Sequence, residues 1–113
     1  LDGYDEISLT DTTKIMTNAG EFVFTPEELG FQRLKQEDLW GGNTIDDVAT
    51  IFMNVLENKA TEAQKNAVII NSAVAIQTRM PLKSIEQCIE EAEHSLEGGY
   101  AKNVFGKFVE IYR

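Results

Sequence analysis

The spacing of hydrophobic residues changes near residue 44, and this change constrains the fold more than any other feature of the chain. Before it, apolar and polar residues alternate in short runs such as residues 7–10, a period of two that is typical of half-buried strands. After it, hydrophobic residues recur every three or four positions, which is typical of helices that bury one face. The chain is therefore predicted to be α+β, with strands first and helices afterwards.

The first quarter of the chain is predicted to hold an N-terminal strand at residues 7–10 and a β-hairpin. The hairpin strands are residues 14–17 and 21–24, and they flank Asn18-Ala19-Gly20, a turn in which Asn and Gly tolerate positive φ. A short helix is expected to start at Thr25, whose hydroxyl can cap it together with Glu28, and to end at Gly30. One more helical turn is expected near residues 36–39.

Four helices are predicted in the remainder, and the first three expected starts carry a recognisable signal. Thr44 precedes two acidic residues that favour the first turn of a helix. Thr61 and Ser84 each stand three residues before a Gln, which is the spacing of a capping box. Gly98-Gly99 ends the third helix, and the fourth runs to the C-terminus.

The apolar faces of these helices predict the core. The second helix is apolar nearly all round over residues 67–76 and is expected to be buried on most sides. Cys88 lies on the apolar face of the third helix, so we expect a buried thiol without reactivity. The aromatic side chains at 105, 108 and 112 are expected to pack in the core, although a dimer contact is an alternative. The first helix carries one apolar stripe, formed by Ile45, Val48, Ile51, Phe52, Val55 and Leu56.

Charge and composition exclude several classes of function. Ten basic residues stand against nineteen acidic ones, a net charge of −9, which argues against nucleic-acid binding because phosphates require clustered Lys and Arg. No apolar run reaches the length that a membrane helix requires, and no signal peptide is recognisable. A single cysteine suits a reducing cytoplasm. Because the first residue is Leu1, we expect a fragment of a longer chain, excised or proteolysed.

The adjacent carboxylates Asp5 and Glu6 are the candidate metal ligands. Mg²⁺ favours one or two hard carboxylate oxygens, completed by waters and substrate phosphates. Consecutive side chains point to opposite faces of a regular strand, so both could reach one ion only on an irregular backbone. Gly3 makes such a bend plausible. The alternative is that the two acids are simply solvated.

Other polar residues are expected to have no catalytic role, and no catalytic residue is assigned. His94 lies on the polar face of the third helix without a partner that acid–base catalysis would need. Ser8 and Thr10 lack a base to activate them and are expected on the polar face of the strand. Residues 40–43, Trp-Gly-Gly-Asn, lack the spacing of a dinucleotide-binding loop and are predicted to cap the following helix.

An ordered series of segments resembles the anthranilate phosphoribosyltransferases. It begins with Asp5-Glu6-Ile7-Ser8, similar to that family's Asp-Glu-x-Ser segment, and covers nearly the whole chain. Differences from the family pattern are Tyr4 for Leu, Asp11-Thr12-Thr13 for a Gly-Pro-Thr turn, and Asn43 for Asp. The other matching segments are Phe24-Thr25-Pro26-Glu27-Glu28-Leu29-Gly30, Leu39-Trp40-Gly41-Gly42-Asn43, Val55-Leu56-Glu57 and Asn66-Ala67-Val68-Ile69-Ile70-Asn71-Ser72-Ala73.

The resemblance implies a reaction and a place within a larger enzyme. Such enzymes transfer phosphoribosyl from phosphoribosyl pyrophosphate to anthranilate in tryptophan biosynthesis, with Mg²⁺, and Asp5 and Glu6 match the acidic pair that holds one of two ions. Residues 1–113 would be the C-terminal part of the α/β domain of a homodimeric enzyme. The glycine-rich substrate loop and the N-terminal helical domain would lie upstream, so the chain alone is expected to be inactive. Alternatives are a nucleoside phosphorylase of similar fold and a non-catalytic interaction or regulatory module.

Overall fold

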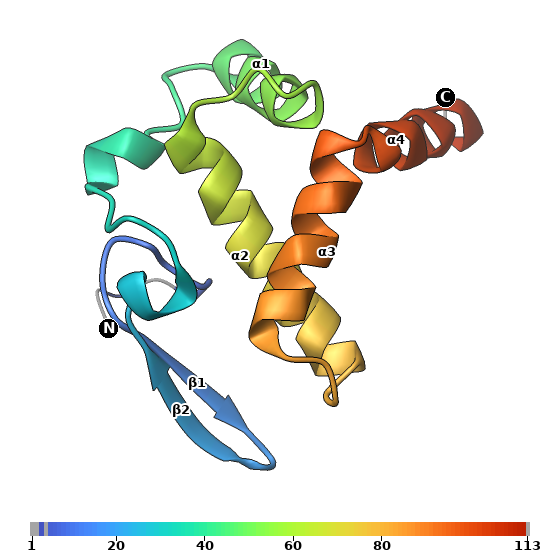
Figure 1. Cartoon of the computed structure of the whole chain (residues 1–113). Coiled ribbons are helices and arrows are strands. Elements are labelled where there is room, and N and C mark those ends of the chain that lie inside the picture. Colours follow the sequence, from blue (N-terminus) through green and yellow to red (C-terminus); the bar gives the residue numbers. More distant parts are fainter. Residues whose placement is uncertain (1–2, 4, 113) are drawn as a thin grey trace.

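The computed structural model describes residue 3 and residues 5–112, and it has the predicted α+β order (Figure 1). An antiparallel hairpin comes first, two short 3₁₀ turns follow, and four helices complete the described chain. The elements are β1 (Thr13–Thr17), β2 (Gly20–Phe24), η1 (Glu27–Leu29), η2 (Gln36–Leu39), α1 (Ile45–Leu56), α2 (Glu62–Arg79), α3 (Ile85–Glu97) and α4 (Tyr100–Ile111).

The strand predicted at residues 7–10 is wrong, because this segment forms an irregular loop. The Ser8 and Thr10 hydroxyls bond each other at 2.7 Å, and the Ser8 hydroxyl also accepts the Thr10 N–H at 3.1 Å. Such local side-chain bonds compete with strand pairing for the same backbone groups. Leu9 turns into the core with 1% of its surface exposed. The alternation of apolar and polar residues therefore arises from a folded loop.

The predicted hairpin is confirmed, with a tighter turn than expected. Thr17 pairs with Gly20, so Gly20 belongs to β2 and the connection consists of Asn18 and Ala19 alone. The short helix after it is confirmed as the 3₁₀ turn η1. Thr25 and Glu28 cap it reciprocally, since each backbone N–H donates to the other's side chain at 3.0 and 3.2 Å. Gly30 ends it at φ 84°.

The helix starts predicted from capping signals are also confirmed. Thr44 caps α1 by accepting the Asp47 N–H. Thr61 with Gln64 and Ser84 with Gln87 form full capping boxes at the starts of α2 and α3. Each box satisfies backbone N–H groups that the first helical turn leaves without partners, which explains why the helices begin at these residues.

The core lies around α2 and α3, which form the most extensive contact between helices and cross at the centre of the molecule (Figure 1). Ile70, Ala73 and Cys88 are fully enclosed there, which confirms the buried interpretation of the thiol. The loop residue Leu9 and Phe31 close one side of this core. The buried hydrophobic side chains are Leu9, Phe31, Val55, Ile69, Ile70, Ala73, Cys88, Ala92 and Leu96.

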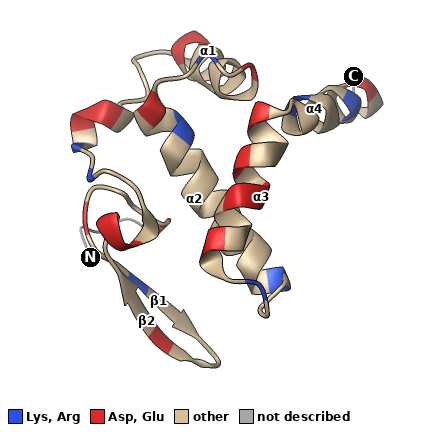
Figure 2. Ribbon diagram, viewed as in Figure 1, with Lys and Arg blue, Asp and Glu red and all other residues tan. Residues whose placement is uncertain are grey.

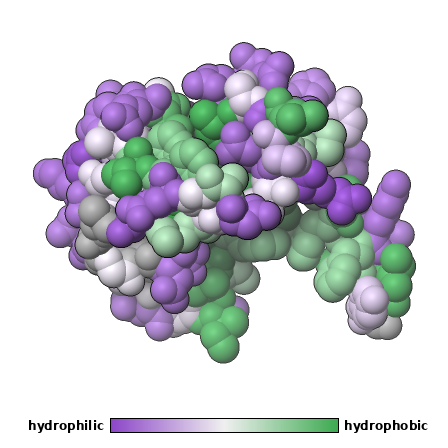
Figure 3. All heavy atoms as spheres, turned by 90° about the horizontal axis from the view of Figure 1, so that it is seen from below, coloured by the Kyte–Doolittle hydropathy of each residue, from purple (hydrophilic) through white to green (hydrophobic). Residues whose placement is uncertain are grey.

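The outer helices are less buried than their sequence pattern predicts. Ile45 on α1 is 87% exposed, and only Val55 of that apolar stripe is buried. Core packing of the C-terminal aromatic residues is wrong for Phe108 and Tyr112, which are 56% and 74% exposed, whereas Phe105 packs against Phe52. Figure 3 shows hydrophobic side chains at the surface of the projecting end that carries the C-terminus. Much of both apolar faces therefore stays exposed in the described chain.

Candidate functional site

Asp5 and Glu6 lie in consecutive bends at the start of the irregular loop, and both are exposed. The regular strand that would have separated their side chains is therefore absent at this point of the described chain. Neither carboxylate forms an ion pair or hydrogen bond with another described residue. The backbone is irregular at this point, as it must be if both side chains are to reach one metal ion.

The carboxylate oxygens of this pair are ligands of the kind that Mg²⁺ prefers, but the pair supplies only two protein ligands. Within residues 3 and 5–112, no three His, Cys, Asp or Glu side chains converge on a point that could hold a metal. Mg²⁺ does not need such a cage, since it uses one or two carboxylates and keeps waters and substrate phosphates as its other ligands. Asp5 and Glu6 could thus contribute to an ion carried by a phosphorylated substrate.

The backbone immediately after the pair is bonded to helix α2. The Asn71 side chain accepts the Ile7 N–H at 2.9 Å and donates to the Ile7 carbonyl at 2.9 Å. The next two residues are bonded as well. The Ser8 N–H donates to the Thr13 hydroxyl, which in turn donates to the Ser8 carbonyl, and the Leu9 carbonyl accepts the Leu34 N–H at 2.8 Å.

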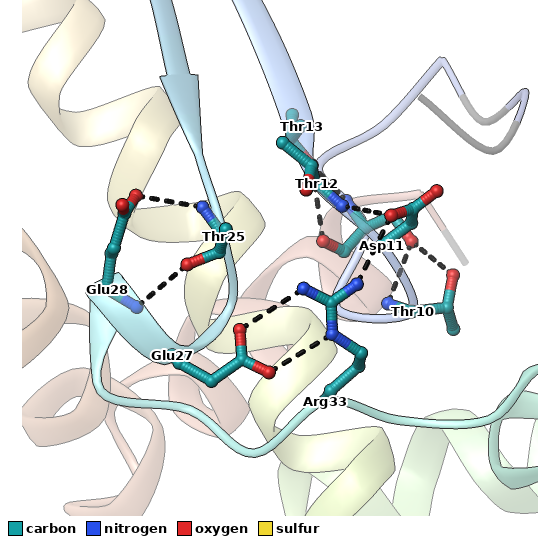
Figure 4. Close-up of polar contacts among 9 residues, drawn as sticks. Thr10, Asp11, Thr12, Thr13, Thr25, Glu27, Glu28 and Arg33 are labelled. Carbon is teal, nitrogen blue, oxygen red and sulfur yellow. Dashed lines mark hydrogen bonds and ion pairs between the residues drawn. The ribbon is translucent and has the colours of Figure 1, made fainter.

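Arg33 joins the end of this loop to the turn η1 (Figure 4). Its guanidinium donates to both carboxylate oxygens of Glu27, at 3.1 and 3.3 Å, and to Asp11 at 3.2 Å. The backbone N–H of Thr12, followed by Arg33, holds the pKa of Asp11 below its ordinary value. The hydrogen bond from Arg33 likewise lowers the pKa of Glu27, and Glu27 raises the pKa of Arg33.

The remaining polar candidates lie where the sequence placed them or have a local structural role. His94 is exposed on α3 and stacks against Tyr100, with ring centroids 5.4 Å apart. The prediction that residues 40–43 cap α1 is wrong, because Thr44 is the cap; the turn is joined to the helix start by the Asn43 N–H, which donates to the Asp47 carboxylate at 3.0 Å. Figure 2 shows acidic residues along α3, while Lys and Arg are scattered over several elements.

Two mainly apolar hollows lie in the described part of the chain, and neither includes the acidic pair. One, of about 450 Å³, lies among α1, α2 and α3 and is lined by residues such as Phe52 and Ile69. The other, of about 340 Å³, lies between the hairpin and the facing ends of α2 and α3, next to Phe22 and Val74. No helix of the described part of the chain is long and apolar enough to cross a bilayer.

Sequence reasoning gave no role to Asn71 or to Arg33. Asn71 interrupts an apolar helical stretch, and a polar side chain at such a position needs hydrogen-bond partners, so the signal was present in the sequence. Its partner could not be identified, because Ile7 is 64 residues away. Arg33 carried no signal, since its two carboxylate partners come from separate segments that only the fold brings together.

Comparisons with known proteins give the same family over nearly the whole chain. Residues 1–102 match the glycosyl transferase family, a/b domain. The anthranilate phosphoribosyltransferase of Phocaeicola vulgatus is 56% identical over 111 residues, which cover 98% of this chain and 34% of that protein. The protein of the same name from Bacteroides fragilis is 55% identical, with the same coverage, and that from Cytophaga hutchinsonii is 45% identical over 96% of this chain and 33% of its own length.

These relatives confirm the resemblance that the ordered motifs indicated, and the chain spans about a third of their length. The crystal structure of anthranilate phosphoribosyltransferase (TrpD) from Thermus thermophilus superimposes with a TM-score of 0.85 at 22% identity, over 97% of this chain and 33% of that one. At this identity the likeness shows the fold alone. Because the family match extends through residues 1–102, this chain belongs to the glycosyl transferase family, a/b domain.

Proposed function

We propose that this chain is the C-terminal part of an anthranilate phosphoribosyltransferase, which transfers phosphoribosyl from phosphoribosyl pyrophosphate to anthranilate with loss of pyrophosphate. The observation that carries the proposal is 56% identity to an enzyme of that name over 98% of the chain. The relatives quoted above all bear this name, which favours this reaction over that of a nucleoside phosphorylase. Residues 1–113 are then one portion of the α/β domain.

The exposed area supports a chain that packs against more protein. A compact monomer of 12.7 kDa has about 6,200 Å² of accessible surface, whereas this chain has 8046 Å². Its radius of gyration is 14.9 Å, against about 13 Å for a compact domain of this length. The exposed apolar side chains of α1 and α4, such as Ile45 and Phe108, contribute to this excess. We infer that these faces are covered in the full-length enzyme.

Asp5 and Glu6 are the residues through which this chain contributes to the chemistry. In the proposal their carboxylates hold a Mg²⁺ ion on phosphoribosyl pyrophosphate. When bound, that ion offsets the negative charge that develops on the departing pyrophosphate. The exposure of both side chains and their bent backbone support this assignment. The chain's own part is to present two negative charges that would hold the cation, and the bound cation would offset the repulsion between this acidic chain and the substrate phosphates.

The proposal also includes a homodimeric, cytoplasmic full-length enzyme without nucleic-acid or membrane partners. The buried free thiol of Cys88 fits a reducing compartment. The net charge of −9 is unfavourable for contact with nucleic acid.

The experiment is a rate measurement on the full-length protein that contains this chain. Anthranilate fluorescence should fall when phosphoribosyl pyrophosphate and Mg²⁺ are present together, and nucleosides with phosphate should give no reaction. The 113-residue chain alone should be inactive, because it supplies only one part of the site. Phosphorolysis of a nucleoside without anthranilate turnover would replace the proposed reaction with its rival. Turnover by the isolated chain would contradict the proposal that the site needs further segments.

A further inference from the structure

The Asn71 side chain forms hydrogen bonds with both the backbone N–H and the backbone carbonyl of one residue of the N-terminal loop, Ile7. Its amide oxygen accepts the Ile7 N–H and its amide nitrogen donates to the Ile7 carbonyl, both at 2.9 Å. The same nitrogen also donates to the backbone carbonyl of Ala67, one turn earlier in α2, at 2.9 Å. All three bonds require the same orientation of the amide, because a flipped amide would face two carbonyls with its oxygen.

This pair of bonds reproduces the exchange between two residues of an antiparallel ladder. It fixes the peptide groups on both sides of Ile7, although the segment is not part of a sheet. Asn71 lies on a rigid base, since its neighbours Ile70 and Ala73 in α2 have no exposed surface. The helix thus serves as the support for a loop that has no secondary structure of its own.

The fixed residue directly follows the acidic pair. Consecutive Cα atoms are about 3.8 Å apart, so the constraint at Ile7 acts one residue from Glu6 and two from Asp5. Both acids are exposed and have no described partner of their own. Their direction is therefore set mainly by the backbone that leads into Ile7. Without the Asn71 bonds, the hydrogen bonds that hold the described loop would begin at Ser8, and only the packing of the Ile7 side chain against the core would act before it.

We propose that Asn71 is a positioning residue, which orients Asp5 and Glu6 toward the metal-bound phosphates of the substrate. This inference rests on the proposed function, because the acids have a role to orient only if they hold the ion. The alternative is that Asn71 merely ties the loop to the helix for stability. A positioning role predicts that loss of the Asn71 bonds raises the Mg²⁺ concentration that the enzyme requires. A purely stabilising role predicts no change in that concentration.

The test compares variants of the full-length enzyme. Asn71→Leu keeps the branched shape of the side chain and removes all three bonds, in a helix that tolerates apolar residues. Gln77→Ala is the matched control, since Gln77 also lies on α2 and donates its amide to a loop carbonyl, that of Lys83, at 3.2 Å. Should Asn71→Leu fold poorly, Asn71→Asp keeps the acceptor for the Ile7 N–H and removes only the donors.

We expect Asn71→Leu to raise the Mg²⁺ concentration for half-maximal rate by about 10- to 100-fold, as found when residues behind metal ligands are lost. Saturating Mg²⁺ should restore much of kcat, and Gln77→Ala should behave as the unmodified enzyme. Calorimetric titration of Mg²⁺ in the presence of phosphoribosyl pyrophosphate should show the same weakening without turnover. Hydrogen exchange of the Ile7 N–H should be faster in Asn71→Leu.

Two further variants separate failure of this inference from failure of the proposed function. If Asp5→Asn and Glu6→Gln weaken Mg²⁺ binding but Asn71→Leu does not, the positioning role is overturned and the metal assignment stands. If neither acid variant affects Mg²⁺ binding, the metal assignment is overturned and the positioning role falls with it. An equal effect of Gln77→Ala and Asn71→Leu would also overturn the positioning role, because loss of any helix–loop bond would then suffice.

Discussion

Replacing Leu9 by Ala should loosen the contact between the N-terminal loop and the core. Leu9 is 1% exposed and belongs to the same buried cluster as Ile70 and Cys88. Truncation of a buried Leu costs about 2.7–5.0 kcal/mol, depending on how far the site can collapse. We expect about 3 kcal/mol, near the lower end, because a loop can relax more than a helix can.

Cys88 provides the assay, because it is the only cysteine of the 113-residue chain and is fully buried. A thiol reagent can reach it only when the core opens, so the labelling rate reports the opening equilibrium when closing is fast. A loss of about 3 kcal/mol raises this rate roughly 150-fold. Leu82→Ala is the matched control, since the same truncation there affects a side chain that is 101% exposed.

A change of less than about 5-fold in the labelling rate of Leu9→Ala, which corresponds to about 1 kcal/mol, would contradict the role of Leu9 in the core. Equal acceleration of labelling by Leu82→Ala would contradict it as well. In either case the loop would not be part of the cooperative core.

Two further changes test the end of the N-terminal loop and the turn η1. Arg33→Met should lower the urea midpoint at pH 7, and its difference from the unmodified chain should shrink as pH falls below about 4.5. The pKa values of Asp11 and Glu27 are lowered in the folded chain from 3.8 and 4.5. The stability that these two carboxylates contribute is therefore present above those values and is lost as they become protonated. A deficit independent of pH would contradict the ion-pair explanation. Gly30→Ala should destabilise by about 1–2 kcal/mol because φ is +84°, whereas Gly41→Ala, without a positive φ or nearby atoms, should be neutral in thermal denaturation.

The sequence predicted the helices and the hairpin well because their signals are local. A capping box is complete within four residues, so Thr61 and Ser84 could be assigned without knowledge of the fold. The same holds for the turn that ends at Gly30. The irregular loop at residues 7–10 was mistaken for a strand because its alternation is also the pattern of a strand. The local bonds from the Ser8 hydroxyl to Thr10, which the alternation does not reveal, distinguish the two.

Burial on α1 and α4 was predicted less well, for a physical reason. Periodicity shows that a face is apolar, but not whether its partner belongs to the same segment of protein. Ile45 and Phe108 are on such faces and are exposed in this chain. The candidate site shows the same limit: Asp5 and Glu6 could be named from the sequence, whereas the support that Asn71 gives to Ile7 spans 64 residues and follows from the fold.

The most direct test of the account is the rate of anthranilate consumption by the full-length enzyme as Mg²⁺ is varied, with and without the acidic pair. Asp5→Asn combined with Glu6→Gln should raise the Mg²⁺ requirement and lower the rate. The control combines Glu86→Gln with Glu90→Gln, which makes the same charge change at two exposed positions of α3. This control should leave the Mg²⁺ requirement and the rate unchanged. An unmodified full-length enzyme that does not consume anthranilate, or an acidic-pair variant that matches the control, would contradict the account.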